Sequence, residues 1–206
     1  MGVTTQSFNF ISQHINDQKS ICELGDQQFY VCYPFKEASF TKVYWENKGL
    51  KHTYIDLHGG NGALPFNLSE DLDIFNLDTL VPKQYDIVTD FGTMEHVDDF
   101  YNGFKNFHKL CKTGGLMIHV LPSLGHWPLH GIWRAPLDFF IKLAKECDYT
   151  ILNAYEEKTS FGGDNSFQCY LAYTKNKDNN FISREKFMSL GVFKTNHDEE
   201  RKIGIS

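Results

Sequence analysis

An acidic residue and a histidine stand side by side at one point of this sequence, in a pattern suited to proton transfer. Glu95 and His96 are adjacent and precede a segment with helical periodicity. A histidine can accept a proton near neutral pH because its unperturbed pKa is about 6.5. We predict that His96 and Glu95 are catalytic residues, with His96 as the candidate general base for a substrate group that must lose a proton.

A second stretch with chemical potential, 125–134, holds two of the three tryptophans of the chain. It follows a predicted buried strand over 116–121, so it forms a loop at the carboxyl end of that strand. Aromatic and imidazole side chains on such a loop favour recognition of a small molecule. The predicted substrate-binding residues are His126, Trp127, His130 and Trp133.

Histidine spacing alone does not predict a metal site in this loop. His126 and His130 are four positions apart, a spacing that can bind a metal ion when both residues lie on one helix. Pro128 lies between them, and no third ligand is evident. We therefore predict no metal site. His119, within the buried strand, is expected to be a core residue.

The element around which the chain is organised is an apolar segment over 20–25, which contains one acid, Glu23. Its small and β-branched residues, ending at Gly25, predict a buried parallel strand followed by a tight turn. In an open α/β sheet, the crevice beyond the carboxyl end of such a strand holds nucleotide-like cofactors.

The other predicted elements follow from hydrophobic periodicity and from glycine and proline positions. They are a helix within 1–19, a helix near 36–48, strands over 53–57, 63–68 and 85–91, a helix over 97–110, a strand over 116–121, a helix over 136–147, and strands over 150–154 and 167–174. Strands that alternate with helices indicate an α/β protein with a mostly parallel sheet. The last two strands are joined by too short a segment for a crossover helix, so the final strand is expected to be antiparallel.

Composition and charge limit the class of protein. The 206 residues are 41% hydrophobic and 22% charged, which fits a globular chain with a sizeable core. The net charge of −6 and the lack of a basic stripe disfavour a nucleic-acid partner. No apolar run is long enough for a membrane span, and no secretion signal is evident. Five scattered cysteines fit reduced thiols and a cytoplasmic location.

We expect one domain over 1–175. The segment 176–206 is a charged C-terminal extension, rich in Lys, Asn, Asp and Glu. Such a composition predicts a solvated helix and a mobile tail.

Four segments, in this order, resemble motifs of the class I S-adenosylmethionine-dependent methyltransferases, in particular the small-molecule, type 11-like group. They are Glu23-Leu24-Gly25, Asp56, Tyr85-Asp86-Ile87-Val88 with Met94-Glu95-His96-Val97, and the segment from Leu110 to Ile118. The resemblance covers roughly residues 20–175. It implies a Rossmann-like three-layer sandwich with a seven-stranded sheet, and an enzyme that uses S-adenosyl-L-methionine to methylate a small or medium polar acceptor at oxygen or nitrogen.

The resemblance also implies which residues bind this cofactor. Asp56, at the end of the second strand, would accept hydrogen bonds from both ribose hydroxyls. The other implied residues are Glu23, Gly25, Asp26 and Gln27 near the methionine end, Leu57 beside Asp56, Asn67 and Leu68 near the adenine, and Asp90, Phe91 and Gly92 at the lip of the crevice.

One departure from the family pattern is the single glycine in Gly25-Asp26-Gln27-Gln28, where the family has a glycine-rich loop. It keeps open a second interpretation, a methyltransferase-like binding or scaffold protein without catalysis. A rival first-strand loop over 59–62 is disfavoured, because the short interval from Gly62 to Tyr85 cannot hold the elements that should follow. The acidic charge disfavours a nucleic-acid methyltransferase.

Overall fold

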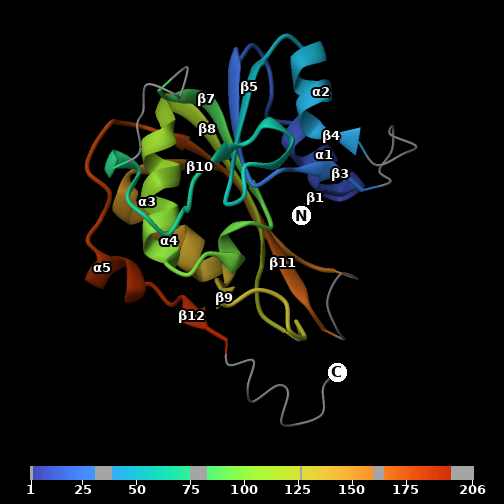
Figure 1. Cartoon of the computed structure of the whole chain (residues 1–206). Coiled ribbons are helices and arrows are strands. Elements are labelled where there is room, and N and C mark those ends of the chain that lie inside the picture. Colours follow the sequence, from blue (N-terminus) through green and yellow to red (C-terminus); the bar gives the residue numbers. More distant parts are fainter. Residues whose placement is uncertain (1, 31–38, 75–82, 126, 160–164, 196–206) are drawn as a thin grey trace.

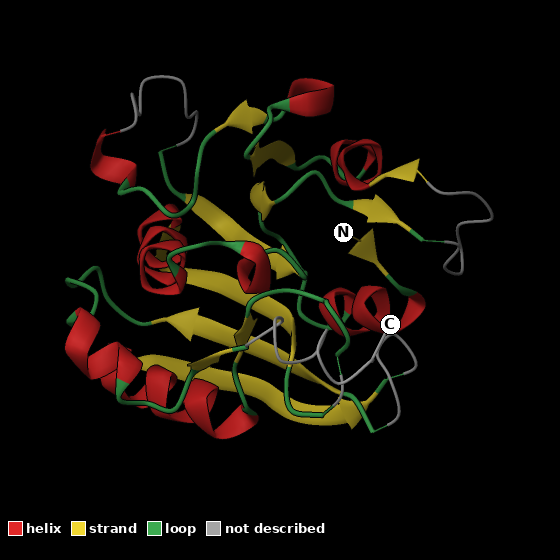
Figure 2. Ribbon diagram, turned by 60° about the horizontal axis from the view of Figure 1, so that its bottom comes forward, coloured by secondary structure: helices red, strands yellow, loops and turns green. Residues whose placement is uncertain are grey.

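The computed structural model describes residues 2–30, 39–74, 83–125, 127–159 and 165–195. Its main feature is a seven-stranded sheet with helices on both faces (Figure 1 and Figure 2). The strands lie in the order β10–β11–β8–β7–β2–β5–β6. Their bounds are β2 Ser20–Leu24, β5 Lys51–Asp56, β6 Leu64–Pro65, β7 Tyr85–Phe91, β8 Cys111–Pro122, β10 Tyr149–Lys158 and β11 Phe167–Lys175.

The strand directions confirm the predicted α/β fold. Strands β6, β5, β2, β7 and β8 are parallel to one another. Strand β11 is antiparallel to both of its neighbours, β8 and β10, which confirms the expected antiparallel final strand. Strand β7 is the central strand of the sheet, and β2 lies beside it, between β7 and β5. The rival loop over 59–62 instead contains a short 3-10 turn, η1 (Gly60–Gly62), after β5.

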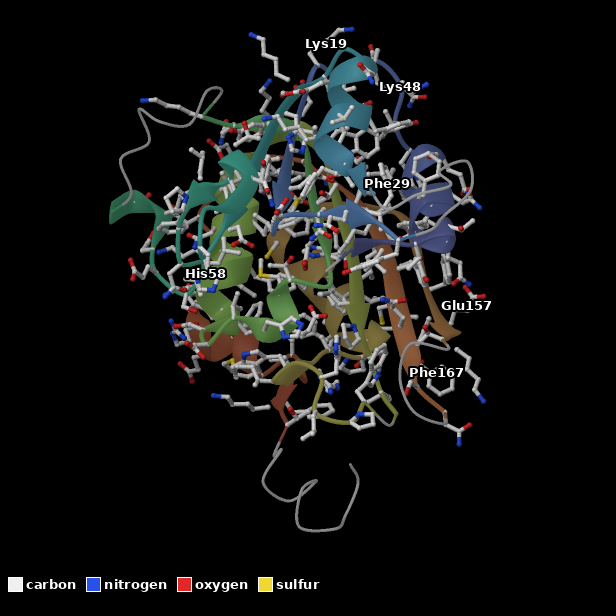
Figure 3. All side chains as sticks on the ribbon, turned by 45° about the vertical axis from the view of Figure 1, so that its right-hand side comes forward. Lys19, Phe29, Lys48, His58, Glu157 and Phe167 are labelled. Atoms are coloured by element: carbon white, nitrogen blue, oxygen red, sulfur yellow. The ribbon has the colours of Figure 1, made fainter. Side chains whose placement is uncertain are left out.

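Two hydrophobic cores lie on opposite faces of the sheet. One lies under α1 (Thr5–Ser12) and α2 (Thr41–Asn47), and the other under α3 (Phe100–Leu110) and α4 (Leu137–Cys147). Successive strand residues point to opposite faces, so Ile21 belongs to the first core and Cys22 to the second. Phe29, labelled in Figure 3, is fully buried in the first core, with its ring 5.6 Å from that of Phe8. These layers confirm the three-layer sandwich.

Some helix boundaries differ from those predicted. The helix expected near 36–48 begins at Thr41, and 31–38 lie outside the described residues. The helix expected over 97–110 begins only at Phe100, because Asp99 caps it by accepting a hydrogen bond from the N–H of Asn102 at 3.1 Å. Before it, Met94–His96 form a separate 3-10 turn, η4. Glu95 and His96 therefore lie in this turn and not at the start of the helix.

The segment between β5 and β7 is short, as the interval from Gly62 to Tyr85 in the sequence predicts. Its described part forms η1, β6 and a 3-10 turn, η2 (Leu72–Ile74), and no α-helix. Residues 75–82 lie outside the described ranges. The short third strand expected over 63–68 is present as β6, but it covers only Leu64–Pro65.

The C-terminal segment packs more closely on the domain than its charge predicts. Helix α5 (Arg184–Met188) is exposed except at Phe187, which is fully buried in the core under α3 and α4. Leu190 and Val192 join the same core. The predicted solvated helix is thus present as α5, but its Phe187 face is buried. Strand β12 (Phe193–Lys194) pairs with β9 (Trp133–Arg134). Residues 196–206 lie outside the described ranges.

At the other end of the chain, β1 (Gly2–Val3) pairs with β3 (Gln28–Phe29), which also pairs with β4 (Ser39–Phe40). This small sheet brings the N-terminus beside the carboxyl ends of the central strands. In the described ranges, no helix has the length and apolar composition needed to cross a bilayer.

Candidate functional site

The turn after β2 has the tight geometry that its glycine predicts. Gly25 has a φ of +84°, a left-handed conformation that glycine adopts without a steric penalty. Its N–H donates to the carbonyl oxygen of Ile55 at 2.7 Å. This bond joins the carboxyl ends of β2 and β5.

A cavity of about 160 Å³ opens beside this turn; we call it the first cavity. Phe66 contributes an apolar wall to this cavity, and Thr93 and His96 also line it. The predicted cofactor-binding residues that line it are Gly25, Asp56, Leu57, Asn67 and Leu68. The structure therefore brings together the residues that were expected near the ribose and the adenine.

The Asp56 carboxylate stands at the edge of the first cavity, at the last residue of β5. It accepts hydrogen bonds from the backbone N–H of His58 at 3.0 Å and of Asp26 at 3.3 Å. A carboxylate can accept about four hydrogen bonds, so capacity remains for the hydroxyl groups of a ligand. His58 is exposed beside it and marks this edge in Figure 3.

Asp26 and Gln27 hold the turn and do not line the first cavity. The Asp26 carboxylate accepts a hydrogen bond from the amide of Asn61 in η1. The Gln27 amide is buried and donates to the Leu24 carbonyl at 2.7 Å and to the Thr93 hydroxyl at 3.1 Å. Sequence reasoning missed Thr93, although its position two residues after the end of a predicted strand is a signal that could have found it.

The Glu23 side chain lies on the face of the sheet that α2 covers. Its buried carboxylate accepts hydrogen bonds from Trp45 Nε1 at 3.0 Å and from the Thr41 hydroxyl, and it lies 2.6 Å from His52 Nε2. The resemblance places Glu23 near the cofactor, whereas these contacts make it the centre of a polar cluster between β2, α2 and β5.

Asp90 shapes the turn that carries Glu95 and His96. Its Oδ1 accepts hydrogen bonds from the N–H groups of Thr93 at 3.0 Å and Met94 at 3.2 Å. Its Oδ2 lies 3.1 Å from Nδ1 of His119, which is 1% exposed. The prediction that His119 is a core residue is confirmed. Asp90 holds the start of η4 through these hydrogen bonds and does not line the first or the second cavity.

A second cavity, of about 340 Å³, lies on the other side of η4. Phe91 and Gly92 line this second cavity, although the resemblance assigns them to the cofactor. The N-terminal segment supplies much of the remaining wall. The lining residues from that segment are Gly2, Thr4, Ser7 and Tyr30. Sequence reasoning missed all four, because only the pairing of β1 with β3 carries them to this end of the sheet.

The aromatic loop contributes to the second cavity only in part. Trp127 and His130 line it, as predicted for substrate-binding residues. Trp133 is instead buried, stacks on Phe100 at 5.3 Å and donates to the Val97 carbonyl at 2.7 Å. Its side chain holds β9 against the start of α3. His126 lies outside the described residues.

Glu95, His96 and His130 meet between the two cavities. Glu95 Oε1 lies 3.4 Å from His130 Nε2 and 3.8 Å from His96 Nε2, and the two imidazole rings are 5.1 Å apart. Glu95 is buried, whereas both histidines are exposed. Burial lowers the pKa of His96, and the Glu95 carboxylate acts in the opposite direction.

Comparison with solved structures shows the fold. A 1,6-didemethyltoxoflavin-N1-methyltransferase from Burkholderia thailandensis, with bound S-adenosylhomocysteine, matches with a TM-score of 0.54 at 11% identity, over 82% of this chain and 76% of that chain. A putative S-adenosylmethionine-dependent methyltransferase from Listeria monocytogenes matches with a TM-score of 0.54 at 14% identity, over 82% and 98%. An O-methyltransferase family protein from Burkholderia thailandensis matches with a TM-score of 0.52 at 9% identity, over 85% and 57%.

The chain therefore has the class I S-adenosylmethionine-dependent methyltransferase fold. No family model and no curated protein matches its sequence. Fold alone does not fix activity, which depends on the residues of the site.

Proposed function

We propose that this protein transfers a methyl group from S-adenosyl-L-methionine to the oxygen or nitrogen of a small or medium polar acceptor. The observation that carries the proposal is the first cavity. It lies at the carboxyl ends of β2 and β5, with a glycine turn on one side and the Asp56 carboxylate at its edge. In open α/β sheets this crevice is the usual place of a nucleotide-like ligand.

The donor set of the first cavity fits that cofactor. The Asp56 carboxylate suits a vicinal pair of ribose hydroxyls, because charge-assisted hydrogen bonds to a carboxylate are strong. Phe66 and Leu68 offer an apolar wall for a purine, and the polar Asn67 lies between them in the sequence. When bound, S-adenosyl-L-methionine would supply an electrophilic methyl group on a sulfonium.

The second cavity supports a small-molecule acceptor. Its 340 Å³ lies within the range of small-molecule pockets, and Trp127 and His130 place aromatic and imidazole groups in it. His96 and Glu95 lie between the two cavities. Methyl transfer requires a nucleophile with a free electron pair. In this proposal the two residues therefore accept the proton that an acceptor hydroxyl or ammonium group must lose.

The location of the protein is also part of this proposal. The cysteines among the described residues, Cys22, Cys111, Cys147 and Cys169, are free and buried. Unpaired thiols support a reducing compartment, and we propose the cytoplasm.

Thermal unfolding with S-adenosylhomocysteine tests the cofactor step. We expect a clear rise in the midpoint, since a ligand at about 100 times its Kd adds roughly 2.7 kcal/mol of stability. Asp56→Ala should abolish the rise. Asp138→Ala is the matched control, because Asp138 is exposed on α4 and forms an ion pair with the exposed Lys142. No rise for the unaltered protein at millimolar ligand would contradict the proposal.

That negative result would favour the second interpretation, a binding protein without catalysis. The buried Gln27 side chain, which occupies the turn where the family has further glycines, is the observation behind it. If the ligand binds, release of S-adenosylhomocysteine from S-adenosyl-L-methionine over a panel of phenols, carboxylic acids and amines identifies the acceptor class.

A further inference from the structure

Glu95, His96 and His130 have the side chains and the spacing of a metal site. Their ligand atoms all lie within 4.8 Å of one another. Two ligand atoms that are each about 2.1 Å from a tetrahedral ion lie about 3.4 Å apart. The separation of Glu95 Oε1 from His130 Nε2 already equals this value, and that of Glu95 Oε1 from His96 Nε2 is 3.8 Å. Small side-chain rotations would therefore complete the geometry.

The Glu95 carboxylate independently points to a ligand. Its side chain is only 3% exposed, and among the described residues its Oε2 is buried without a hydrogen-bond partner. Burying a carboxylate is costly unless a charge or several donors compensate it. The two histidines approach only Oε1. A cation held between them would balance the buried charge.

The surrounding backbone is shaped to hold these three side chains close. Gly131 has a φ of +62°, and a Cβ at this position would lie 2.6 Å from Cγ of Glu95. A Cβ at Gly92 would lie 3.1 Å from Oε1 of Glu95. The N–H of Ile132 donates to the Glu95 carbonyl at 2.6 Å. Side chains at either glycine would crowd the carboxylate.

A buried arginine also holds the loop that carries His130. The buried Arg134 guanidinium donates from Nη2 to the carbonyl oxygens of His130 at 2.6 Å and Trp127 at 3.2 Å. Metal sites require ligands held within a fraction of an ångström by such supporting contacts. The loop is thus positioned before any ligand arrives.

We propose that Glu95, His96 and His130 bind one divalent transition-metal ion of the Zn²⁺, Mn²⁺ or Fe²⁺ class at the junction of the two cavities. Two imidazoles and one carboxylate suit these ions, whereas Mg²⁺ and Ca²⁺ prefer oxygen ligands alone. His96 lines the first cavity and His130 lines the second. Coordination positions not used by the protein are therefore open toward the cavities.

This site deepens the proposed function by naming the acceptor class, and that part rests on the proposed function. With the ion bound, His96 and Glu95 would act as its ligands and not as the general base assigned above, and an acceptor hydroxyl on the ion would lose its proton to water more readily, since a metal lowers the pKa of a bound hydroxyl group. Its oxygen would then form the C–O bond to the methyl group while the C–S bond breaks, leaving the electron pair on sulfur. The proposed acceptor is a hydroxyl compound that coordinates the ion.

Isothermal titration of chelator-treated protein with ZnCl₂, MnCl₂ and MgCl₂ tests the site. We expect one Zn²⁺ or Mn²⁺ per chain and no binding of Mg²⁺ at the same concentrations. His130→Gln and Glu95→Gln should weaken binding by at least about 10-fold to 100-fold, the loss seen even for residues that only support ligands. His58→Gln is the control, because His58 is exposed and lies outside the cluster.

The Glu95→Gln variant also separates lost binding from lost folding. Without metal it should unfold at the same temperature as the unaltered protein or higher, because the substitution replaces a buried carboxylate whose Oε2 has no hydrogen-bond partner among the described residues. Absence of Zn²⁺ and Mn²⁺ binding by the unaltered protein, or equal binding by all three variants, would overturn the proposal. S-adenosylhomocysteine binding without metal binding would leave the proposed function standing and refute this site alone.

Discussion

At the scale of single residues, Glu23 shows how an acid can belong to the core of a sheet. Its carboxylate is fully buried and is surrounded by Thr41, Trp45 and His52. Hydrogen bonds to an ionised group are stronger than those between neutral groups. The cluster ties β2, which carries the glycine turn, to α2 and β5.

Glu23→Gln should therefore lower the free energy of unfolding by about 3 kcal/mol, because an amide cannot satisfy donors placed for a carboxylate. Urea unfolding measures this loss. Glu46→Gln is the matched control and should change stability by less than about 1 kcal/mol, since its pair with Lys42 is exposed and 4.0 Å long.

The same Glu23 variant decides whether the residue also binds the cofactor. Unchanged affinity of the folded Glu23→Gln protein for S-adenosylhomocysteine would assign Glu23 a positioning role. Lost affinity at unchanged stability would restore the direct contact that the family resemblance implies.

At the scale of elements, the packing of the 127–132 loop on η4 creates the region between the two cavities. Gly131 is the point of closest approach, because a Cβ there would meet both Cγ and Cβ of Glu95. Gly114, with a φ of +77°, has a similar backbone but open space around it. Substitutions at these two glycines therefore separate the cost of backbone strain, which both share, from the cost of a steric clash, which only Gly131 has.

We predict that Gly114→Ala lowers stability by about 1–2 kcal/mol, the cost of left-handed backbone for a residue with a Cβ. Gly131→Ala should lose more, since it adds displacement of the loop to the same strain. Thermal or urea unfolding compares the two. Equal losses would mean that the loop does not press on Glu95.

At the scale of the whole molecule, a buried cluster joins α3, β10, β11 and the segment after β11. His108 Nδ1 lies 2.6 Å from the Tyr149 hydroxyl, and its Nε2 lies 2.7 Å from the Asn179 carbonyl. The buried Lys175 Nζ donates to the His108 and Cys111 carbonyl oxygens, each at 2.9 Å. Burial, together with the Lys175 charge, lowers the pKa of His108 to about 4.

This shift predicts acid destabilisation of the fold. The unfolded chain protonates His108 near pH 6.5, whereas the folded protein does so only near pH 4, so the unfolded state binds more protons between these values. The contribution of His108 to the free energy of unfolding is complete above pH 6.5 and falls by about 3 kcal/mol as the pH drops to 4. Urea unfolding between pH 7 and pH 5 should show a shallower pH dependence for His108→Gln than for His58→Gln. Equal slopes would contradict the assignment.

The sequence by itself determined the order of elements and the ends of the central strands. The strand predicted over 85–91 matches β7, because its apolar pattern is local. The short connection before 167–174 determined the antiparallel final strand, since no crossover helix fits there. Gly25 and Asp56 line the predicted crevice because each directly follows or ends a parallel strand, and such ends meet at one edge of the sheet.

Only the tertiary structure decided what each side chain faces. Glu23 and Gln27 stand near the expected turn, yet their side chains bind α2 and Thr93, respectively. His130 meets Glu95 of η4, because loop packing brings segments that are distant in the sequence together. The burial of Phe187 has the same origin. Local patterns report which residues form an element, whereas contacts between elements depend on packing that no local pattern contains.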